Sequence, residues 1–189
     1  MKRINPYYSV WLKTKITVDY VLSVDSTFLY FLPIIIGGFS TSLGKVTYPT
    51  YTDESLITET LQFSELIMDI VFLVLLYSIL WIFVIPWLLL ISGRIIDGSG
   101  TFSGLQRIMG VANIARILPI PFQIIRISTG EMVGPEEVHY IVQILTWFFY
   151  WKFLLIGIAK VQKFSYGFAI VNIAIVFLPL IFLYIWMRS

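Results

Sequence analysis

The sequence predicts an all-α fold: a polytopic integral membrane helix bundle with five transmembrane helices and a short N-terminal interfacial helix. Residues 66–91 form a long, largely apolar run that is interrupted by one Asp and one Pro. As a helix this run would rise about 39 Å, which exceeds the roughly 30 Å hydrocarbon layer of a bilayer. The composition is 58% hydrophobic and 13% charged, whereas soluble domains carry about 25% charged residues. Length and composition together therefore indicate a single membrane domain rather than a soluble core.

Residues 1–26 form a predicted cytoplasmic or interfacial arm. Trp11 and Val18 share one helical face, whereas Lys13 and Lys15 lie elsewhere. This pattern is typical of a helix at the membrane surface whose aromatic side chains lie among headgroups and whose lysines face anionic lipid. An arm that binds a partner protein has the same pattern. We expect no removable signal peptide, because the start lacks an apolar run followed by a small-residue cleavage site.

The remaining residues, 27–189, are predicted to form one five-helix transmembrane domain. Its expected spans are 27–43, 66–91, 105–127, 138–159 and 166–187. The third span is the least regular, because Pro119 and Pro121 remove two backbone donors. We expect this helix to bend or end there, with its free carbonyls protected by neighbouring helices.

The distribution of Lys and Arg predicts the orientation. With the N-terminus inside, the cytoplasmic segments hold eight basic residues: Lys2, Arg3, Lys13, Lys15, Arg94, Arg107, Lys160 and Lys163. The opposite side holds only Lys45, Arg126 and Arg188. Basic residues accumulate in cytoplasmic loops. We therefore expect a prokaryotic cytoplasmic membrane, with the N-terminus in the cytoplasm and the C-terminus outside.

Several classes of function are disfavoured by the residues that are rare or missing. The chain has no Cys and one His, His139, which excludes disulfides, thiol nucleophiles and metal sites built from cysteines or several histidines. Ser92, Ser99 and Ser103 lie near loops that are expected on the membrane face opposite to His139, so a Ser–His nucleophile is not expected. We expect no enzyme activity, no cofactor and no nucleic-acid partner.

Four polar residues inside the predicted spans fall at one depth. Asn113, Arg116, Lys152 and Asn172 lie about 9–14 Å from the cytoplasmic ends of their spans at 1.5 Å per residue. One hypothesis is a pocket, open to the cytoplasm, for an anionic lipid headgroup or a small anion. The alternative is that the two cations reach to the interface and the two amides join helices.

A second polar group is expected near the outer end of the second span. Glu65 and Asp69 are one helical turn apart and roughly level with Arg126. An ion pair with Arg126 is the simpler interpretation. The alternative is a relay for protons or cations, which normally needs further carboxylates through the membrane.

Three segments, in order, resemble a known family. The first segment is Asn5-Pro6-Tyr7-Tyr8-Ser9-Val10-Trp11, followed by Val24-Asp25-Ser26-Thr27 and Gly37-Gly38. The second runs from Ser92-Gly93-Arg94 through Gly98-Ser99-Gly100-Thr101-Phe102 to Arg107-Ile108-Met109-Gly110 and Pro119. The third contains Trp147, residues 157–165, Ala169 and Asn172. Together they are similar to prokaryotic YIP-type (Ypt/Rab-interacting protein) membrane proteins. The resemblance implies a five-helix domain with a cytoplasmic N-terminus. Eukaryotic members of the family are linked to Rab-type GTPases. Their N-terminal arm is long and acidic, whereas the arm of this chain is short and basic. Lys160, directly before Val161-Gln162, stands where the family usually has an acidic residue.

The sequence therefore favours a non-enzymatic membrane protein that organises membrane lipids, a membrane-protein partner or copies of itself. The alternative is a transporter or channel subunit for a small solute or ion. A continuous polar path across the bilayer would favour that alternative, whereas the sequence places a polar layer in one half and an acidic pair at the other end.

Overall fold

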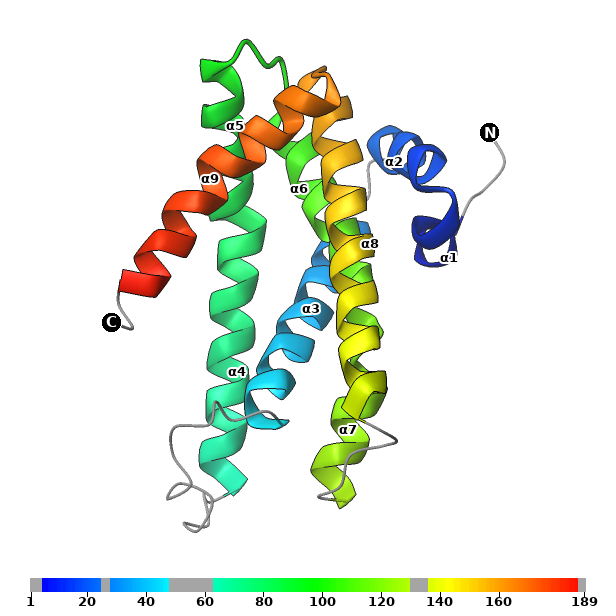
Figure 1. The fold of residues 1–189 in the computed structure, drawn as a ribbon, viewed down its shortest axis with the longest axis vertical. Coiled ribbons are helices and arrows are strands. Elements are labelled where there is room, and N and C mark those ends of the chain that lie inside the picture. The colour runs from blue at the N-terminus through cyan, green and yellow to red at the C-terminus, as the bar shows by residue number, and fades with distance from the viewer. Residues whose placement is uncertain (1–4, 25–27, 48–62, 130–135, 187–189) are drawn as a thin grey trace.

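The chain forms an all-helical bundle in the computed structural model, which describes residues 5–24, 28–47, 63–129 and 136–186. Figure 1 shows its long helices running side by side, with α9 crossing the bundle obliquely and α1 and α2 beside α8. The element bounds are α1 Pro6–Leu12, α2 Thr14–Ser23, α3 Phe28–Thr47, α4 Phe63–Ile79, η2 Leu80–Val84, α5 Ile85–Ile95, α6 Phe102–Ala112, η3 Asn113–Ile117, α7 Ile120–Thr129, α8 Glu136–Gln162 and α9 Tyr166–Trp186. The prediction of an all-α membrane-type fold is confirmed at this level.

Within the described residues, each of the five predicted spans is mainly helical, but the helices differ in length. Two uninterrupted helices, Ile67–Ile95 and Val138–Gln162, are long and apolar enough to cross a bilayer. A third is obtained if the bent pair Phe102–Ile117 and Ile120–Thr129 is counted as one span. The apolar parts of α3 and α9, Tyr30–Gly44 and Tyr166–Phe182, are shorter than a full span. The structure thus supports two or three membrane-crossing helices, and five remains a prediction.

The predicted break in the third span is confirmed. The two helices on either side of Pro119 meet at 45°. Because prolines have no N–H, the carbonyls before them lose their usual donors. The chain tightens into the 3₁₀ segment η3, where the Leu118 N–H bonds to the Ala115 carbonyl at 3.3 Å.

Pro86 changes the long helix that α4, η2 and α5 form together. Residues Leu80–Val84 form a π-helical turn that ends two residues before Pro86. Pro86 has no N–H to give to the Ile82 carbonyl four residues earlier. The Gln106 side chain, buried on α6, donates Nε2–H to that carbonyl at 2.9 Å. A side chain from another helix thus supplies the missing backbone hydrogen bond.

The N-terminal arm differs from the prediction of one interfacial helix. It forms two helices, α1 and α2, separated at Lys13, and it packs on α6 and α8. Val10, Val18 and Val21 are buried, and Trp11 meets Phe149 of α8 edge to face with 5.0 Å between ring centroids. The apolar stripe read from the sequence therefore faces the protein's own helices, because α8 offers a matching aromatic surface.

Two polar contacts hold the arm to the bundle. The Arg107 guanidinium of α6 donates from Nη1 to the carbonyls of Leu22 and Val24, at 3.3 and 2.9 Å, where α2 ends. Asp19 of α2 forms an ion pair with Lys160 of α8. A cation at a helix C-terminus also interacts favourably with the helix dipole.

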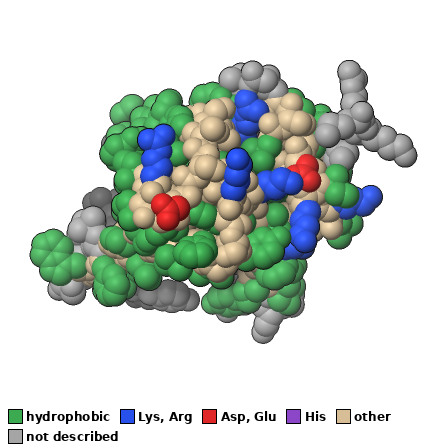
Figure 2. Space-filling model, turned by 90° about the horizontal axis from the view of Figure 1, so that it is seen from above, with side chains coloured by type: hydrophobic (Ala, Val, Ile, Leu, Met, Phe, Trp, Pro, Cys, Tyr) green, Lys and Arg blue, Asp and Glu red, His purple; other side chains and the backbone are tan. Residues whose placement is uncertain are grey.

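Basic side chains gather at one end of the bundle. Viewed from above, the face that carries the turns after α5 and α8 shows several Lys and Arg side chains and few acidic ones (Figure 2). The exposed residues there include Arg94, Lys160 and Lys163, with Asp97 among them. This end is the one that the sequence predicts to face the cytoplasm.

Candidate functional site

The candidate site is built around Arg116, which lies on η3 between the long helices. Its guanidinium carbon lies 5.4 Å from the ring centroid of Tyr77 and 5.9 Å from that of Trp81. The rings of Trp147 and Tyr150 on α8 lie at 5.8 and 5.1 Å. The cation is therefore surrounded by aromatic rings from two sides, each in range for a cation–π interaction.

The position of this aromatic cage along the bundle is central. Trp81 is the middle residue of the apolar helix Ile67–Ile95, and Tyr150 is the middle residue of Val138–Gln162. The Trp81 and Tyr150 rings touch edge to face, with centroids 5.8 Å apart. Arg116 therefore lies level with the centres of both candidate spans.

Hydrogen bonds fix the residues beside the cation. Arg116 donates from Nη1 to the Thr41 hydroxyl of α3 at 3.1 Å. Fully buried Asn113, one turn before Arg116, accepts a 2.6 Å hydrogen bond from the Tyr77 hydroxyl and donates to the Met109 carbonyl at 2.7 Å. Gly37 of α3 is needed here, since a Cβ at that position would lie 2.5 Å from the Asn113 side-chain oxygen.

The four residues predicted to form one polar layer have different neighbours. Asn113 and Arg116 belong to the cage. The Lys152 ammonium lies instead 5.9 and 5.8 Å from the ring centroids of Phe148 and Phe149 on its own helix. Asn172 of α9 is fully buried and donates to the Leu89 carbonyl of α5 at 3.2 Å. The structure thus joins two of the four and gives the other two separate contacts.

Asn172 belongs to a second polar junction that the sequence did not reveal. Gln162, 1% exposed at the end of α8, donates to the Leu89 carbonyl at 3.0 Å and accepts from the Gly100 N–H at 3.0 Å. Gly93 packs directly against both amide side chains. This junction connects the turn after α5 to the C-terminal end of α8 and to the N-terminal part of α9.

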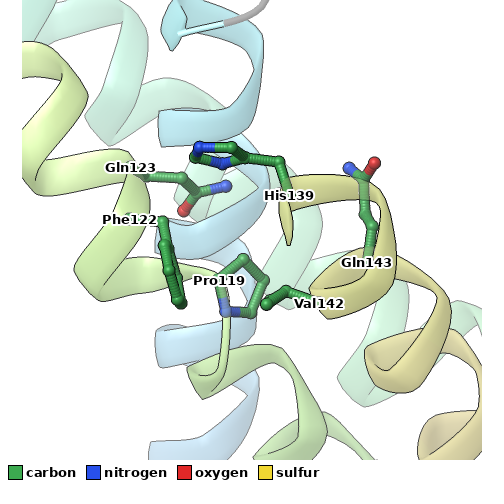
Figure 3. Close-up of a pocket in the computed structure, with 6 residues that line it drawn as sticks. All are labelled: Pro119, Phe122, Gln123, His139, Val142 and Gln143. Carbon is green, nitrogen blue, oxygen red and sulfur yellow. The ribbon is translucent and has the colours of Figure 1, made fainter. Parts of the chain in front are cut away.

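Polar side chains continue from the cage toward the other end of the bundle. Ser40, beside Thr41 on α3, donates to the Gln123 amide oxygen at 3.4 Å. Gln123, Pro119 and His139 line one small pocket, which Phe122, Val142 and Gln143 complete (Figure 3). Toward the basic end, α6 and α8 carry fully buried apolar side chains, among them Leu105, Ile108 and Phe153. Buried polar side chains described there, such as Gln106 and Gln162, donate to backbone carbonyls of neighbouring helices.

The predicted outer ion pair stays a prediction. The structure places Asp69 on the exposed surface of α4 and partly exposed Arg126 on α7. The Glu65 side chain lies outside the described residues. Among the residues that the structure describes, no group of three or more His, Cys, Asp or Glu side chains is arranged to hold a metal ion.

The fold and the site define a class: an all-helical bundle with two or three helices fit to cross a membrane and an arginine enclosed by aromatic rings at their centre. Comparison with known proteins adds no family to this description, because no protein-family model, curated protein or solved structure matches the chain.

Proposed function

We propose that this chain is a non-enzymatic integral membrane protein that organises membrane-protein or lipid partners. The observation that carries the proposal is the Arg116 guanidinium, which lies among apolar helices and forms no ion pair with a carboxylate of the described residues. An ionisable residue inside a membrane is costly and is usually kept for a specific interaction. The outward faces of α4, α8 and α9 carry large exposed apolar side chains, which suit contacts with lipid or with other helices.

The proposed topology is five spans in a prokaryotic cytoplasmic membrane, as in the YIP-type proteins that the sequence resembles. In this proposal α3 and α9 complete the set, and the basic end faces the cytoplasm. Reporter fusions at Lys45, Gly98, Gly134 and Lys163 should report outside, inside, outside and inside, because Lys and Arg retain their loops on the cytoplasmic side. A cytoplasmic signal at Gly134 contradicts five spans.

The proposed function is tested by photo-crosslinking in the native membrane. A photoreactive residue replaces Ile144 of α8 or Leu76 of α4, both exposed, and in a matched control it replaces fully buried Ile108. We expect discrete adducts with another protein, or with a copy of this chain, at the two exposed positions and none at Ile108. Mass spectrometry identifies the protein or lipid in each adduct. Adducts with bulk lipid alone, in membrane proportions, contradict an organising role.

Passage of a small solute is a second candidate function, favoured by the polar side chains from Arg116 through Thr41, Ser40 and Gln123 to His139. The packing in the other half argues against it, because fully buried Leu105 and Ile108 fill the space at α6 and the Gln106 amide is already bonded to the Ile82 carbonyl. Flux into vesicles that contain the purified protein, above that of protein-free vesicles, would favour this candidate.

A further inference from the structure

The geometry points to Arg116 as the docking point for a partner's transmembrane helix that carries one carboxylate near its centre. This inference rests on the proposed function and names the chemistry of one partner. The inference rests on the position of Arg116, which lies level with the centres of two candidate spans. Aromatic rings enclose its guanidinium on two sides, and the residue is still partly exposed.

The first argument is charge. Within the described part of the chain, Arg116 forms no ion pair; its hydrogen bond goes to the neutral Thr41 hydroxyl. The described Asp residues lie toward the helix ends: Asp19 pairs with Lys160, Asp97 is in the turn after α5, and Asp69 is two residues into the apolar helix Ile67–Ile95. The sequence has no Asp or Glu in 98–130 or 138–189. The described part of the chain therefore supplies no carboxylate for Arg116 at this depth, and we infer that another molecule does.

The second argument is depth. Arg116 lies level with the centres of both long apolar helices, so about 15 Å of hydrocarbon separates it from either interface of a roughly 30 Å layer. An arginine side chain is too short to reach the headgroups from there. The aromatic rings offset part of the cost of the charge, but they supply no negative charge. An ion pair with a carboxylate gives shorter and stronger hydrogen bonds than neutral partners give.

The third argument is that the cage can be reached from outside the bundle and that Arg116 has an N–H that donates no hydrogen bond to the described residues. Trp147, one wall of the cage, is 50% exposed, and Arg116 itself is partly exposed. The Arg116 Nε is a buried atom without a hydrogen-bond partner among the described residues. Large apolar side chains flank the cage on the lipid-facing surface, including Leu80 and Phe148. A helix laid against this surface would bury its apolar side chains and bring a central carboxylate to the guanidinium.

Other occupants fit less well. A second copy of this chain offers no carboxylate at the matching depth among the residues that the structure describes. An anionic lipid carries its charge in the headgroup, which lies at the interface and not at the centre of the layer. The chemistry therefore favours a different membrane protein with one Asp or Glu in the middle of an apolar helix.

The test uses the full chain in neutral phosphatidylcholine vesicles. The probe is a synthetic helix of about 20 apolar residues, long enough to span the bilayer, with Glu, Gln or Leu at its centre. The chain has no Cys, so Ser103→Cys at an exposed position gives one site for a fluorescent label. Energy transfer to a labelled peptide then reports binding. We expect the Glu peptide to bind about tenfold more tightly than the Gln peptide, a ratio set by one additional charged interaction.

Three variants assign the preference to Arg116. Arg116→Gln should remove it, Arg116→Lys should retain part of it, and Lys152→Gln should leave it unchanged, because Lys152 is a cation near the middle of Val138–Gln162 that lies outside the cage. Helix content and size-exclusion profiles check that each variant folds. If Arg116→Gln does not fold, the Glu-to-Gln ratio for the wild-type chain still decides.

Equal binding of the Glu and Gln peptides overturns the inference, and so does a preference that persists in Arg116→Gln or disappears in Lys152→Gln. These results would leave the photo-crosslinking adducts untouched, so failure of this inference is distinguishable from failure of the proposed function. Adducts that map to α4 and α8 and disappear in Arg116→Gln, from a protein with a central carboxylate, would support both.

Discussion

Replacing Gly110 with alanine should destabilise the bundle by about 1–3 kcal/mol, the cost of overpacking a filled core. A Cβ at Gly110 of α6 would collide with the Cα and Cβ of Tyr30 and lie 2.6 Å from its carbonyl oxygen. Backbone atoms cannot turn aside as a side chain can, so α3 would have to move. Unfolding in mixed detergent and dodecyl sulfate micelles, followed by circular dichroism, measures the change in free energy.

Gly167→Ala is the matched control. Gly167 lies in the first turn of α9, and the nearest heavy atom to an added Cβ there is the Ser165 hydroxyl oxygen at 3.8 Å. Since alanine favours helix by about 1 kcal/mol over glycine in a helix interior, this control should be neutral or stabilising. If Gly110→Ala is as stable as Gly167→Ala, the close contact between α3 and α6 is wrong.

Replacing Gln106 with leucine should cost about 1–3 kcal/mol, because it leaves the Ile82 carbonyl without a donor in an apolar surrounding. The cost should fall in combination with Pro86→Ala, since an alanine at this position restores an N–H four residues after Ile82. The wild-type chain, the two single variants and the double variant form a double-mutant cycle, and the same unfolding experiment measures the stability of each. A coupling free energy near zero would show that Gln106 does not act through the carbonyl that Pro86 leaves free.

The cycle separates the lost hydrogen bond from lost packing. Leucine and glutamine differ little in length, and Gln106 is 8% exposed, so a packing defect would appear equally with either residue at position 86. Only the hydrogen-bond explanation makes the cost depend on the proline.

The sequence by itself determined the fold class and the places of the helices. Apolar runs of the length needed to cross a bilayer have few structures open to them, because in lipid every backbone group must be bonded within the segment or its neighbours. The break at Pro119 was also local, since a proline removes its own donor wherever it lies. The long helices lie where the sequence places them, with ends that differ by a few residues, whereas the N-terminal arm forms two helices instead of one.

Other features depended on which faces meet. The stripe of Val10 and Val18 showed that the arm has an apolar side, but only the structure shows that α6 and α8 cover it. The sequence gives the depth of Arg116 and Lys152 along their helices, but it does not give the rotation of each helix about its own axis. That rotation points Arg116 into the aromatic cage and Lys152 toward Phe148 and Phe149.

Long-range hydrogen bonds were decided entirely by tertiary structure. Gln106 and Gln162 carry no sequence pattern that marks them, yet one satisfies the carbonyl left free by Pro86 and the other closes the junction of α5, α8 and α9. A proline in an apolar helix signals that a donor is needed. Which residue supplies it follows only from how the helices pack, because the partners lie 24 and 73 residues apart along the chain.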